Sequence, residues 1–474
     1  MSTASARVSA GALTRAVPAA VARLRAVAST QLGRRLVTST FWSATSESLS
    51  RGLLFVGMIL VARTLNTAAY GEFGLVRSTI NMFAAFGGMG LGLTANRFVA
   101  EHRTRNPRLA GDIAGSSLLV ATMAGLIVGL AVLVAAPWLA TVALHAPQLE
   151  WGLRLSAFML LLGAVNGAQM GVLQGLEAYQ QLAIGSVIQG IVAVVGLTVG
   201  AKLYGLDGAL LGLLSYMLAG VVALQWQMRV ALARGGITLR FRAIRATLPI
   251  FLAFSLPVML SGVAIAPLRW FAETLVVRTV GFAELGLFHA AMTIATMLTA
   301  LVSTLHAPLL SVTANAGGSR RVERTSLYGG WYASLVLTLP LLLFPSLAAL
   351  VLGAKFDTPA FRGVVVLLAA YVALMMYYQG VLRLIALRGS MWFALGTNLL
   401  EGAALIAAFV WLGKRGALGL GVAYVASYVV RIAITLPVLA RGSVIRPDLL
   451  WDRGFLLSLA ALCVLVTVQL RGVW

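Results

Sequence analysis

Charged residues are scarce in this sequence, and their scarcity excludes a soluble globular protein. Only 11% of the 474 residues are charged, whereas 60% are hydrophobic, and the mean hydropathy is +0.93. A typical soluble domain carries about 25% charged residues. The composition therefore predicts a chain that crosses a membrane many times.

Cysteine is nearly absent, and the histidines do not follow a metal-binding pattern. Cys463 is the only cysteine in the sequence, which excludes an internal disulfide and a cysteine-based metal cluster. The four histidines, at positions 102, 145, 289 and 306, show neither H-E-x-x-H spacing nor a similar metal-ligand pattern. We therefore expect no metal site and no cofactor.

A soluble catalytic domain has no room in the chain, because every segment between the hydrophobic runs is short. A membrane glycosyltransferase or polysaccharide polymerase has similar hydropathy, but such an enzyme usually needs acidic or basic catalytic groups in a sizeable outer loop. We therefore expect that the protein is not an enzyme, and we keep this class as the least favoured alternative.

Long hydrophobic runs fill most of the chain. About 20 apolar residues cross the hydrocarbon core as a helix, and runs rich in Gly, Ala and Leu lack the short alternation of a membrane barrel. The chain holds about thirteen such runs, the last being the least clear, at residues 37–62, 72–96, 112–136, 151–174, 179–201, 206–228, 249–277, 283–311, 327–352, 361–383, 389–412, 417–439 and 454–470. The sequence thus predicts an all-α polytopic membrane protein.

The charge that is present is mostly positive. The 36 basic and 14 acidic residues give a formal net charge of +22, which in a soluble chain suggests a nucleic-acid partner. The basic residues gather instead on one side of the predicted helices, in the N-terminal tail and in the loops at 97–108, 229–245, 317–324 and 440–453. The positive-inside rule makes this side cytoplasmic. The distribution of the basic residues therefore indicates how the chain is oriented in the membrane, and we expect no nucleic-acid partner.

The N-terminal tail, residues 1–36, contains six arginines and no acid, and it is rich in Ala and Ser. This composition imitates an organellar transit peptide. It also fits a basic tail that lies on the anionic cytoplasmic face of a membrane, which is the interpretation that we prefer. The N-terminus is then cytoplasmic.

An internal repeat is visible in VARTLNTAAYGEFGLVRS (61–78) and VVRTVGFAELGLFHA (276–290), which match once a gap of three residues is allowed. The matching triplets begin at Arg63 and Arg278. Further pairs, such as GLDGALLGLLSY (205–216) with GALGLGVAYVASY (416–428), keep a period of about 210 residues. Helices 1 to 6 therefore match helices 7 to 12.

An even number of helices in each repeat preserves orientation, so the repeats are parallel and form two six-helix lobes around a central cavity. This is the architecture of a transporter that works by rocking its lobes. We divide the chain into a basic tail (1–36), an N-lobe (37–228), a cytoplasmic linker (229–248), a C-lobe (249–440) and a C-terminal loop with an extra helix (441–474).

The predicted helix at 37–62 carries charge where the bilayer is least polar. At about 1.5 Å per residue, Glu47 lies near the midplane if the helix enters the membrane at its first residue. Ser43, Glu47 and Arg51 follow i, i+4, i+8 spacing and share one face. Charged groups at this depth normally face the interior of a bundle. The residues favour a wet cavity, although a simple Glu47–Arg51 ion pair explains them as well.

Further ionisable side chains lie in the predicted helices. Arg77 and Arg431 have no acid within one helical turn, so an external anion suits them, whereas Arg269 and Glu273 are spaced as an i, i+4 pair. An arginine fork suits a pyrophosphate because it makes bidentate contacts and stays charged. Candidate substrate-binding residues are Arg51, Arg77, Arg431, Arg269, Tyr378 and Gln379, and candidate ion-coupling residues are Glu47, Glu401 and Glu273. Polar aromatic and amide groups also serve as interfacial anchors or interhelical hydrogen-bond partners.

Three stretches resemble the O-antigen and exopolysaccharide repeat-unit translocases of the multidrug/oligosaccharidyl-lipid/polysaccharide superfamily. They are FWSATSESLSRGLLFVGMILVARTLNTAAYGEFGLVRS (41–78), GMGLGLTANRFVAEHR (88–103) and ETLVVRTVGFAELGLFHAA (273–291). Such proteins typically show an aromatic start to helix 1, a nearby Ala-Arg-x-Leu, a Tyr-Gly-x-Phe-Gly start to helix 2 and a glycine-rich end before a basic loop. The resemblance covers roughly residues 37–440, although members usually have twelve or fourteen helices.

This resemblance implies a flippase of the bacterial inner membrane. It would move an undecaprenyl-diphosphate-linked oligosaccharide repeat unit from the cytoplasmic to the periplasmic leaflet, with the headgroup in a cationic cavity and the lipid tail in the bilayer. Arg51, Arg77 and Arg431 are residues of the type that such a cationic cavity would contain. The implied partners are the lipid-linked oligosaccharide, membrane lipid and other polysaccharide-assembly proteins.

The main alternative is a proton- or sodium-coupled multidrug antiporter of the same superfamily. In that reading a buried carboxylate such as Glu47 or Glu401 exchanges a small cation against an organic one. The excess of arginine inside the predicted helices opposes a cationic substrate. A lipid II flippase is closer by mechanism, and the sequence separates it poorly from a repeat-unit flippase.

Overall fold

The computed structural model describes residues 49, 51–88, 90–241, 244–303, 320–387, 391–412, 415–441 and 452–472, and this part of the chain is helical without strands. Nine of its helices are long and apolar enough to cross a membrane. The predicted all-α membrane fold with about thirteen transmembrane helices is confirmed. The basic tail and Glu47 lie outside the described residues.

The first half of the chain starts with a helix at 51–64. The elements that follow are α3 (Thr67–Gly87), α4 (Leu91–His102), α5 (Pro107–Trp138), the π-helix η1 (Leu139–Ala143), the short η2 (Pro147–Leu149), α6 (Glu150–Gly175) and α7 (Tyr179–Arg234).

The second half repeats this order of long helices. Its elements are α8 (Ile244–Val280), α9 (Phe282–Ser303), α11 (Arg320–Leu343), α12 (Ser346–Leu352), η3 (Ala354–Phe356), α13 (Pro359–Leu387), α14 (Met391–Leu412), α15 (Gly416–Arg441) and α17 (Arg453–Leu470).

Side-chain caps fix where several helices begin. The Asn66 side chain accepts a hydrogen bond from the Ala69 amide at 2.7 Å and starts α3. Asn106 caps α5, and Pro107 occupies the first helical turn, where a missing N–H costs nothing. Asp452 caps α17 in the same way. Capping residues therefore set the helix ends that hydropathy alone leaves vague.

Glycine separates helices where the hydropathy pattern does not. The predicted helix at 72–96 is two helices, since α3 ends at Gly87 and α4 begins at Leu91. Glycines lower helix propensity by about 1 kcal/mol each relative to Ala, and this stretch is rich in them. Inside α7, Tyr204 and Gly205 leave the helical region, and Gly205 has φ +57°, which glycine adopts without strain. This kink separates the two helices predicted at 179–201 and 206–228.

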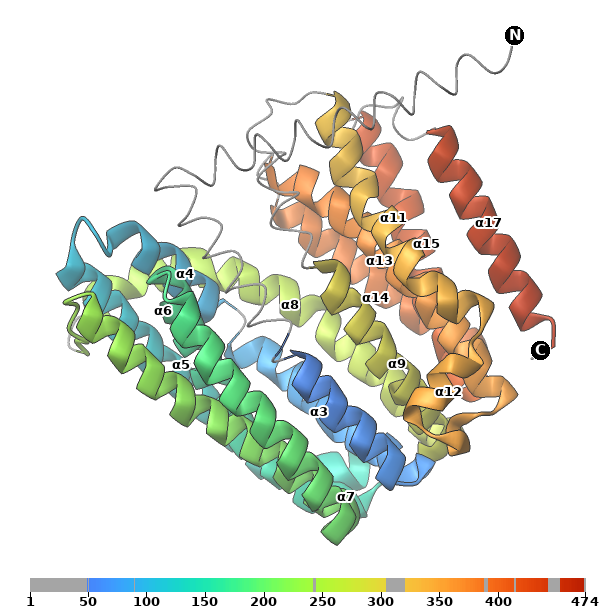
Figure 1. Cartoon of the computed structure of the whole chain (residues 1–474), viewed down its shortest axis with the longest axis horizontal. Coiled ribbons are helices and arrows are strands. Elements are labelled where there is room, and N and C mark those ends of the chain that lie inside the picture. The colour runs from blue at the N-terminus through green and yellow to red at the C-terminus, as the bar shows by residue number, and fades with distance from the viewer. Residues whose placement is uncertain are drawn as a thin grey trace.

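The helices form two groups that meet along α3 and α9 (Figure 1). In the first half, α6 packs between α5 and α7 and also contacts α4. In the second half, α13 contacts α11 and α15, and α14 contacts α15 and α8. The thirteenth segment, α17, packs on the outside against α11 and α13. The long contact between α3 and α9 joins the two groups.

The repeat is more regular in the structure than in the sequence alignment. α3 begins the same number of residues after Arg63 as α9 begins after Arg278. Gly71 therefore corresponds to Gly286, and the gap of three residues predicted from the sequence is not needed.

Candidate functional site

A cavity of about 550 Å³, lined by both charged and apolar side chains, lies between the two groups of helices. Its walls come from the helix at 51–64, α3, α8 and α9, with Tyr371 of α13 and Tyr424 of α15. Besides the two tyrosines, the ionisable side chains among the described lining residues are Arg51, Arg77, Arg269, Glu273 and His289. Arginine therefore dominates the charge of the described wall.

Helical periodicity explains why these residues share the cavity. On α3, the lining residues Gly74, Arg77, Ser78 and Asn81 follow i, i+3, i+4, i+7 spacing. On α9, the same spacing continues through His289, Met292, Thr293, Thr296, Met297 and Ala300. With 3.6 residues per turn, such positions fall on one face.

Arg77 is half-buried on α3, and its guanidinium carbon lies 5.8 Å from the centre of the Phe73 ring. This contact lies within the range of a cation–π interaction. Arg51 is exposed on the neighbouring helix and lines the same cavity. Both arginines are within reach of a ligand that enters the cavity.

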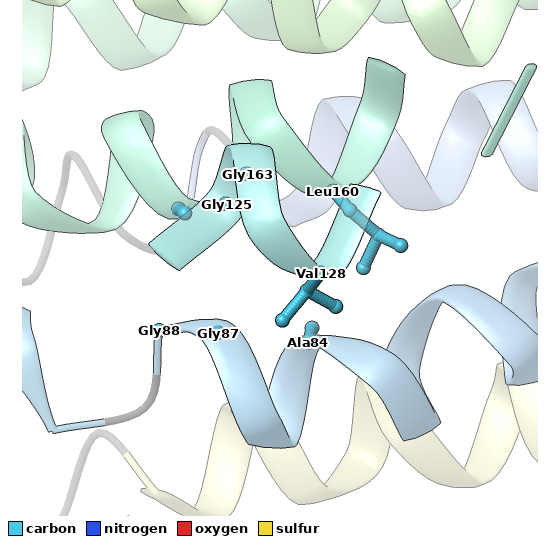
Figure 2. A pocket seen from close by; sticks show the side chains of 8 residues that line it. Ala84, Gly87, Gly88, Gly125, Val128, Leu160 and Gly163 are labelled. Atoms are coloured by element: carbon cyan, nitrogen blue, oxygen red, sulfur yellow. The ribbon is translucent and has the colours of Figure 1, made fainter. Parts of the chain in front are cut away.

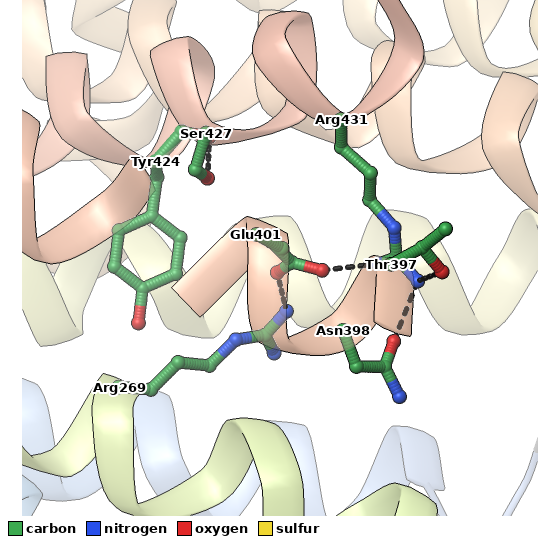
Figure 3. Close-up of polar contacts among 7 residues, drawn as sticks. All are labelled: Arg269, Thr397, Asn398, Glu401, Tyr424, Ser427 and Arg431. Carbon is green, nitrogen blue, oxygen red and sulfur yellow. Dashed lines mark hydrogen bonds and ion pairs between the residues drawn. The ribbon is translucent and has the colours of Figure 1, made fainter. Parts of the chain in front are cut away.

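The third arginine of the cavity wall, Arg269, is anchored by a residue that is not part of the lining. Its guanidinium forms a salt bridge with Glu401 of α14 at 2.5 Å (Figure 3). The salt bridge is not made with Glu273, which lies one turn away on α8. The sequence spacing suggested the Arg269–Glu273 pair, but the packing of α8 against α14 brings Glu401 to the guanidinium instead. Arg269 is 32% exposed, so it is anchored while part of it faces the cavity.

Glu401 also binds a second arginine. Its other oxygen accepts a hydrogen bond from Arg431 of α15, which further donates to Asn398 Oδ1 at 2.5 Å and to Thr397 Oγ1 at 3.2 Å (Figure 3). The side chains of Glu401 and Arg431 are 2% and 4% exposed. Two guanidinium groups therefore share one carboxylate in a buried cluster.

Tyrosine rings complete the surroundings of Arg431. Its guanidinium carbon lies 4.0 Å from the centre of the Tyr378 ring and 5.7 Å from that of Tyr428. Stacking on aromatic faces is a favourable environment for arginine. Arg431 is thus a buried, paired residue, and the acid that the sequence lacks near it comes from another helix.

Glu273 lies one helical turn after Arg269 on α8, beside His289 of α9. One carboxylate oxygen of Glu273 is 3.5 Å from Nε2 of His289, and both side chains are nearly buried. Gly74 of α3 makes room for the imidazole, since a Cβ there would overlap its ring. Within the described residues, no three His, Cys, Asp or Glu side chains gather as metal ligands.

The structure brings together four of the candidate residues from the sequence: Arg51, Arg77, Arg269 and Glu273 line one cavity. It places Glu401 and Arg431 behind the cavity wall. Tyr378 is buried under Arg431, and Gln379 is half-buried on α13; neither belongs to the described lining.

Sequence reasoning missed His289 and Asn81 as cavity residues. Asn81 lies one turn after Arg77 on α3, which the sequence singles out, whereas His289 lies on α9, where the sequence offers no other candidate. Their positions on the lining faces of α3 and α9 were the available signal.

A second, apolar cavity of about 210 Å³ lies inside the first half, between α3, α5 and α6 (Figure 2). Its wall is made of small and aliphatic residues: Ala84, Gly87, Gly88, Gly125, Val128, Leu160, Gly163 and Ala164. The wall carries no ionisable group among these residues.

Residues 36–314 match the family described as polysaccharide biosynthesis protein. This match covers more than half of the chain. The chain belongs to this family. No curated protein is significantly similar to it.

Solved transporters share the fold of this family member. A multidrug resistance MATE family transporter of the MOP superfamily in an inward-facing conformation matches with a TM-score of 0.57 at 19% identity, over 82% of this chain and 93% of that chain. An outward-facing structure of such a transporter gives a TM-score of 0.58 at 18% identity, over 88% and 96%. Identities this low establish the fold alone.

A third solved structure is a MOP superfamily transporter from Pyrococcus furiosus, described as having a binding pocket of reverse polarity that suggests a different function. It matches with a TM-score of 0.59 at 18% identity, over 86% of this chain and 95% of that chain. The polysaccharide biosynthesis family member thus has a MATE-like fold and is a multi-pass membrane protein.

Proposed function

We propose that the protein is a flippase that moves an undecaprenyl-diphosphate-linked oligosaccharide repeat unit from the cytoplasmic to the periplasmic leaflet by alternating access. The observation that carries this proposal is the cavity between the two groups of helices, whose described wall holds Arg51, Arg77 and Arg269. Membership in a polysaccharide biosynthesis family supports it. The basic loops favour the bacterial inner membrane with a cytoplasmic N-terminus, where other polysaccharide-assembly proteins act.

A diphosphate suits the chemistry of this wall. Guanidinium forks donate paired hydrogen bonds to phosphate oxygens and stay charged. Ser78, Asn81 and Thr296 add neutral polar groups that can bind sugar hydroxyls. A volume of about 550 Å³ falls within the usual range for small-molecule sites, about 300–1,000 Å³. The charged headgroup can thus enter the cavity while the polyprenyl tail stays in lipid.

Glu401 and Arg431 act on this site through Arg269. The salt bridge to Glu401 fixes one side of the Arg269 guanidinium, so a phosphate meets a pre-oriented donor. Glu401 also binds Arg431 through its other oxygen, so one negative charge is shared between two guanidinium groups and the three side chains together keep a positive charge. We therefore assign Glu401 to positioning rather than to ion coupling.

Glu273 with His289 is the proposed coupling site, since a carboxylate and an imidazole at 3.5 Å can hold a proton, which the negative charge of a phosphate in the cavity favours and its departure releases. A proton gradient across proteoliposomes is then expected to accelerate transport by the parent protein and not by Glu273→Gln. Transport rates measured with and without the gradient check this. Equal acceleration of both proteins would remove Glu273 from the coupling step.

A cation antiporter is the second candidate function. The carboxylate of Glu273 in the cavity wall and the MATE-like fold favour it. Three arginines in the same wall oppose it, because they repel a cationic substrate before it reaches Glu273. The flippase is therefore the better reading of the cavity.

The proposal is tested by complementation of a bacterial strain that lacks its repeat-unit flippase. The parent protein is expected to restore surface polysaccharide, and Arg77→Ala and Arg269→Ala are expected to abolish the rescue at equal membrane expression. Arg154→Ala is the matched control, because Arg154 is exposed and bridges to Glu150 within α6, away from the cavity. Absence of rescue by the parent, together with new resistance to cationic dyes, would favour the antiporter.

A further inference from the structure

Two arginines cross between the halves of the molecule at the same end. Arg63, at the end of the helix at 51–64, donates to the carbonyl oxygens of Val351 at 2.8 Å and Leu350 at 3.0 Å. Both carbonyls belong to α12 of the other half. One side chain thus bridges two elements that are far apart in sequence.

The second arginine makes the same bridge in the opposite direction. Arg278, near the end of α8, donates from Nε to the Ala143 carbonyl at 2.9 Å and from its terminal nitrogen to the Val142 carbonyl at 2.6 Å. Both acceptors belong to η1 of the first half. Each half therefore contributes one arginine and receives the other.

The two bridges occupy equivalent places in the repeat. Arg63 and Arg278 end the first long helix of their halves, and their acceptors lie in the elements η1 and α12, which come directly after the third long helices α5 and α11. The following residues, Thr64 and Thr279, also match, since each hydroxyl donates to backbone carbonyls of the preceding turn. The arrangement is a two-fold related pair rather than two unrelated contacts.

Helix ends supply suitable acceptors. The last carbonyls of a helix have no partner within the helix, and arginine side chains commonly bind them. A guanidinium fork reaches two carbonyls at once, which fixes the angle of the bridge as well as its length. Such a contact breaks as a unit when the two elements move apart.

Further contacts close the same end. Lys355 of η3 donates to the carbonyl oxygens of Arg63 and Leu65, and burial lowers the pKa of its ammonium group. The helices α3 and α9 touch backbone to backbone at Gly71 and Gly286, where a Cβ on either glycine would overlap the other helix. The residues that line the central cavity begin only beyond these contacts, at Gly74 of α3.

We propose that Arg63 and Arg278 form a two-fold latch that keeps this end of the transporter closed, and that both bridges open together when the cavity becomes accessible from this side. The latch deepens the alternating access of the proposed function, but it does not depend on the chemistry of the substrate. By the positive-inside rule the closed end is periplasmic.

Accessibility of the cavity to a thiol reagent tests the latch. Asn81→Cys, which is exposed in the cavity, is introduced together with Cys463→Ser, which removes the native thiol. Right-side-out and inverted membrane vesicles are treated with a membrane-impermeant maleimide. A separate Ala354→Cys protein, with its thiol in η3 beside the latch, identifies which face carries the closed end.

The double variant Arg63→Ala/Arg278→Ala is expected to increase labelling of Asn81→Cys several-fold from the latch face, and to lower it from the other face. Each single variant is expected to give an intermediate increase. Arg154→Ala removes an arginine of α6 that pairs only within its own helix, so labelling stays at the parent level. Labelling from the latch face that equals the parent's in the double variant would overturn the latch.

Two controls keep the outcome interpretable. Size-exclusion chromatography of the detergent-solubilised variants checks folding, and if the double variant fails to fold, the single variants and Arg63→Lys/Arg278→Lys replace it, since lysine keeps the charge but not the fork. Because labelling needs no substrate, unchanged labelling with intact complementation rejects the latch alone. Changed labelling without complementation rejects the substrate assignment alone.

Discussion

At the residue scale, the structure changes the roles of two residues that the sequence singles out. Arg431 and Glu401 are 30 residues apart and on different helices, so no spacing rule reveals that they pair. Arg269 and Glu273 have the spacing of a helical ion pair, yet each finds a partner on another helix. Pairing inside a membrane bundle is decided by helix packing, which a single sequence does not contain.

Glu401→Gln is expected to lower the melting temperature of the detergent-solubilised protein strongly. The change leaves the guanidinium groups of Arg269 and Arg431 without their carboxylate in a buried site, and breaking a buried pair costs about 3–5 kcal/mol. Thermal unfolding followed by fluorescence measures the effect.

Glu150→Gln is the matched control for this variant. Glu150 bridges to Arg154 one turn away, and the arginine side chain is 54% exposed. Exposed pairs contribute about 0–1 kcal/mol, so this variant is expected to melt near the parent. If Glu401→Gln melts like Glu150→Gln, the buried cluster does not hold the helices as described.

At the element scale, most of the architecture follows from hydropathy. The predicted segments at 417–439 and 454–470 differ from α15 and α17 by few residues, and the division of α7 at Gly205 was predicted as two helices. The division between α3 and α4 was not predicted, because both pieces are apolar and the glycines between them leave the hydropathy high. Hydropathy locates the membrane-spanning segments, whereas glycines and capping residues determine where each helix ends.

Gly286→Ala is expected to destabilise the contact between α3 and α9. Its Cβ would overlap the backbone oxygen of Thr67, which no side-chain rotation relieves, so the helices must separate. A clear drop in melting temperature is expected. Gly163→Ala is the control, because nothing lies within 4 Å of a Cβ there; alanine in a helix is favoured over glycine by about 1 kcal/mol, so this variant is expected to melt at or above the parent. Equal melting of both variants would contradict the tight contact.

At the scale of the whole molecule, the two halves contribute equivalent helices but different charged residues to the central cavity. The repeat places equivalent helices around one cavity, while its charged residues differ between the halves: Arg51 and Arg77 come from the first, and Arg269, Glu273 and His289 from the second. The repeated sequence therefore predicts the two-lobed architecture, whereas the unequal residues set the charge of the cavity wall. The sequence predicted the presence of cavity arginines, but which arginines remain available depends on the three-dimensional pairing.

The most direct test of the central claim is transport by the purified protein in proteoliposomes that carry undecaprenyl-diphosphate-linked oligosaccharide in the membrane. Periodate oxidation of the sugars that reach the outer face reports movement between the leaflets. We expect time-dependent exposure of the sugars by the parent protein, close to none with Arg77→Ala/Arg269→Ala, and parent-level exposure with Arg154→Ala. Movement by the double variant at the parent rate would show that the cavity arginines do not carry the substrate and would rule out the proposed flippase mechanism.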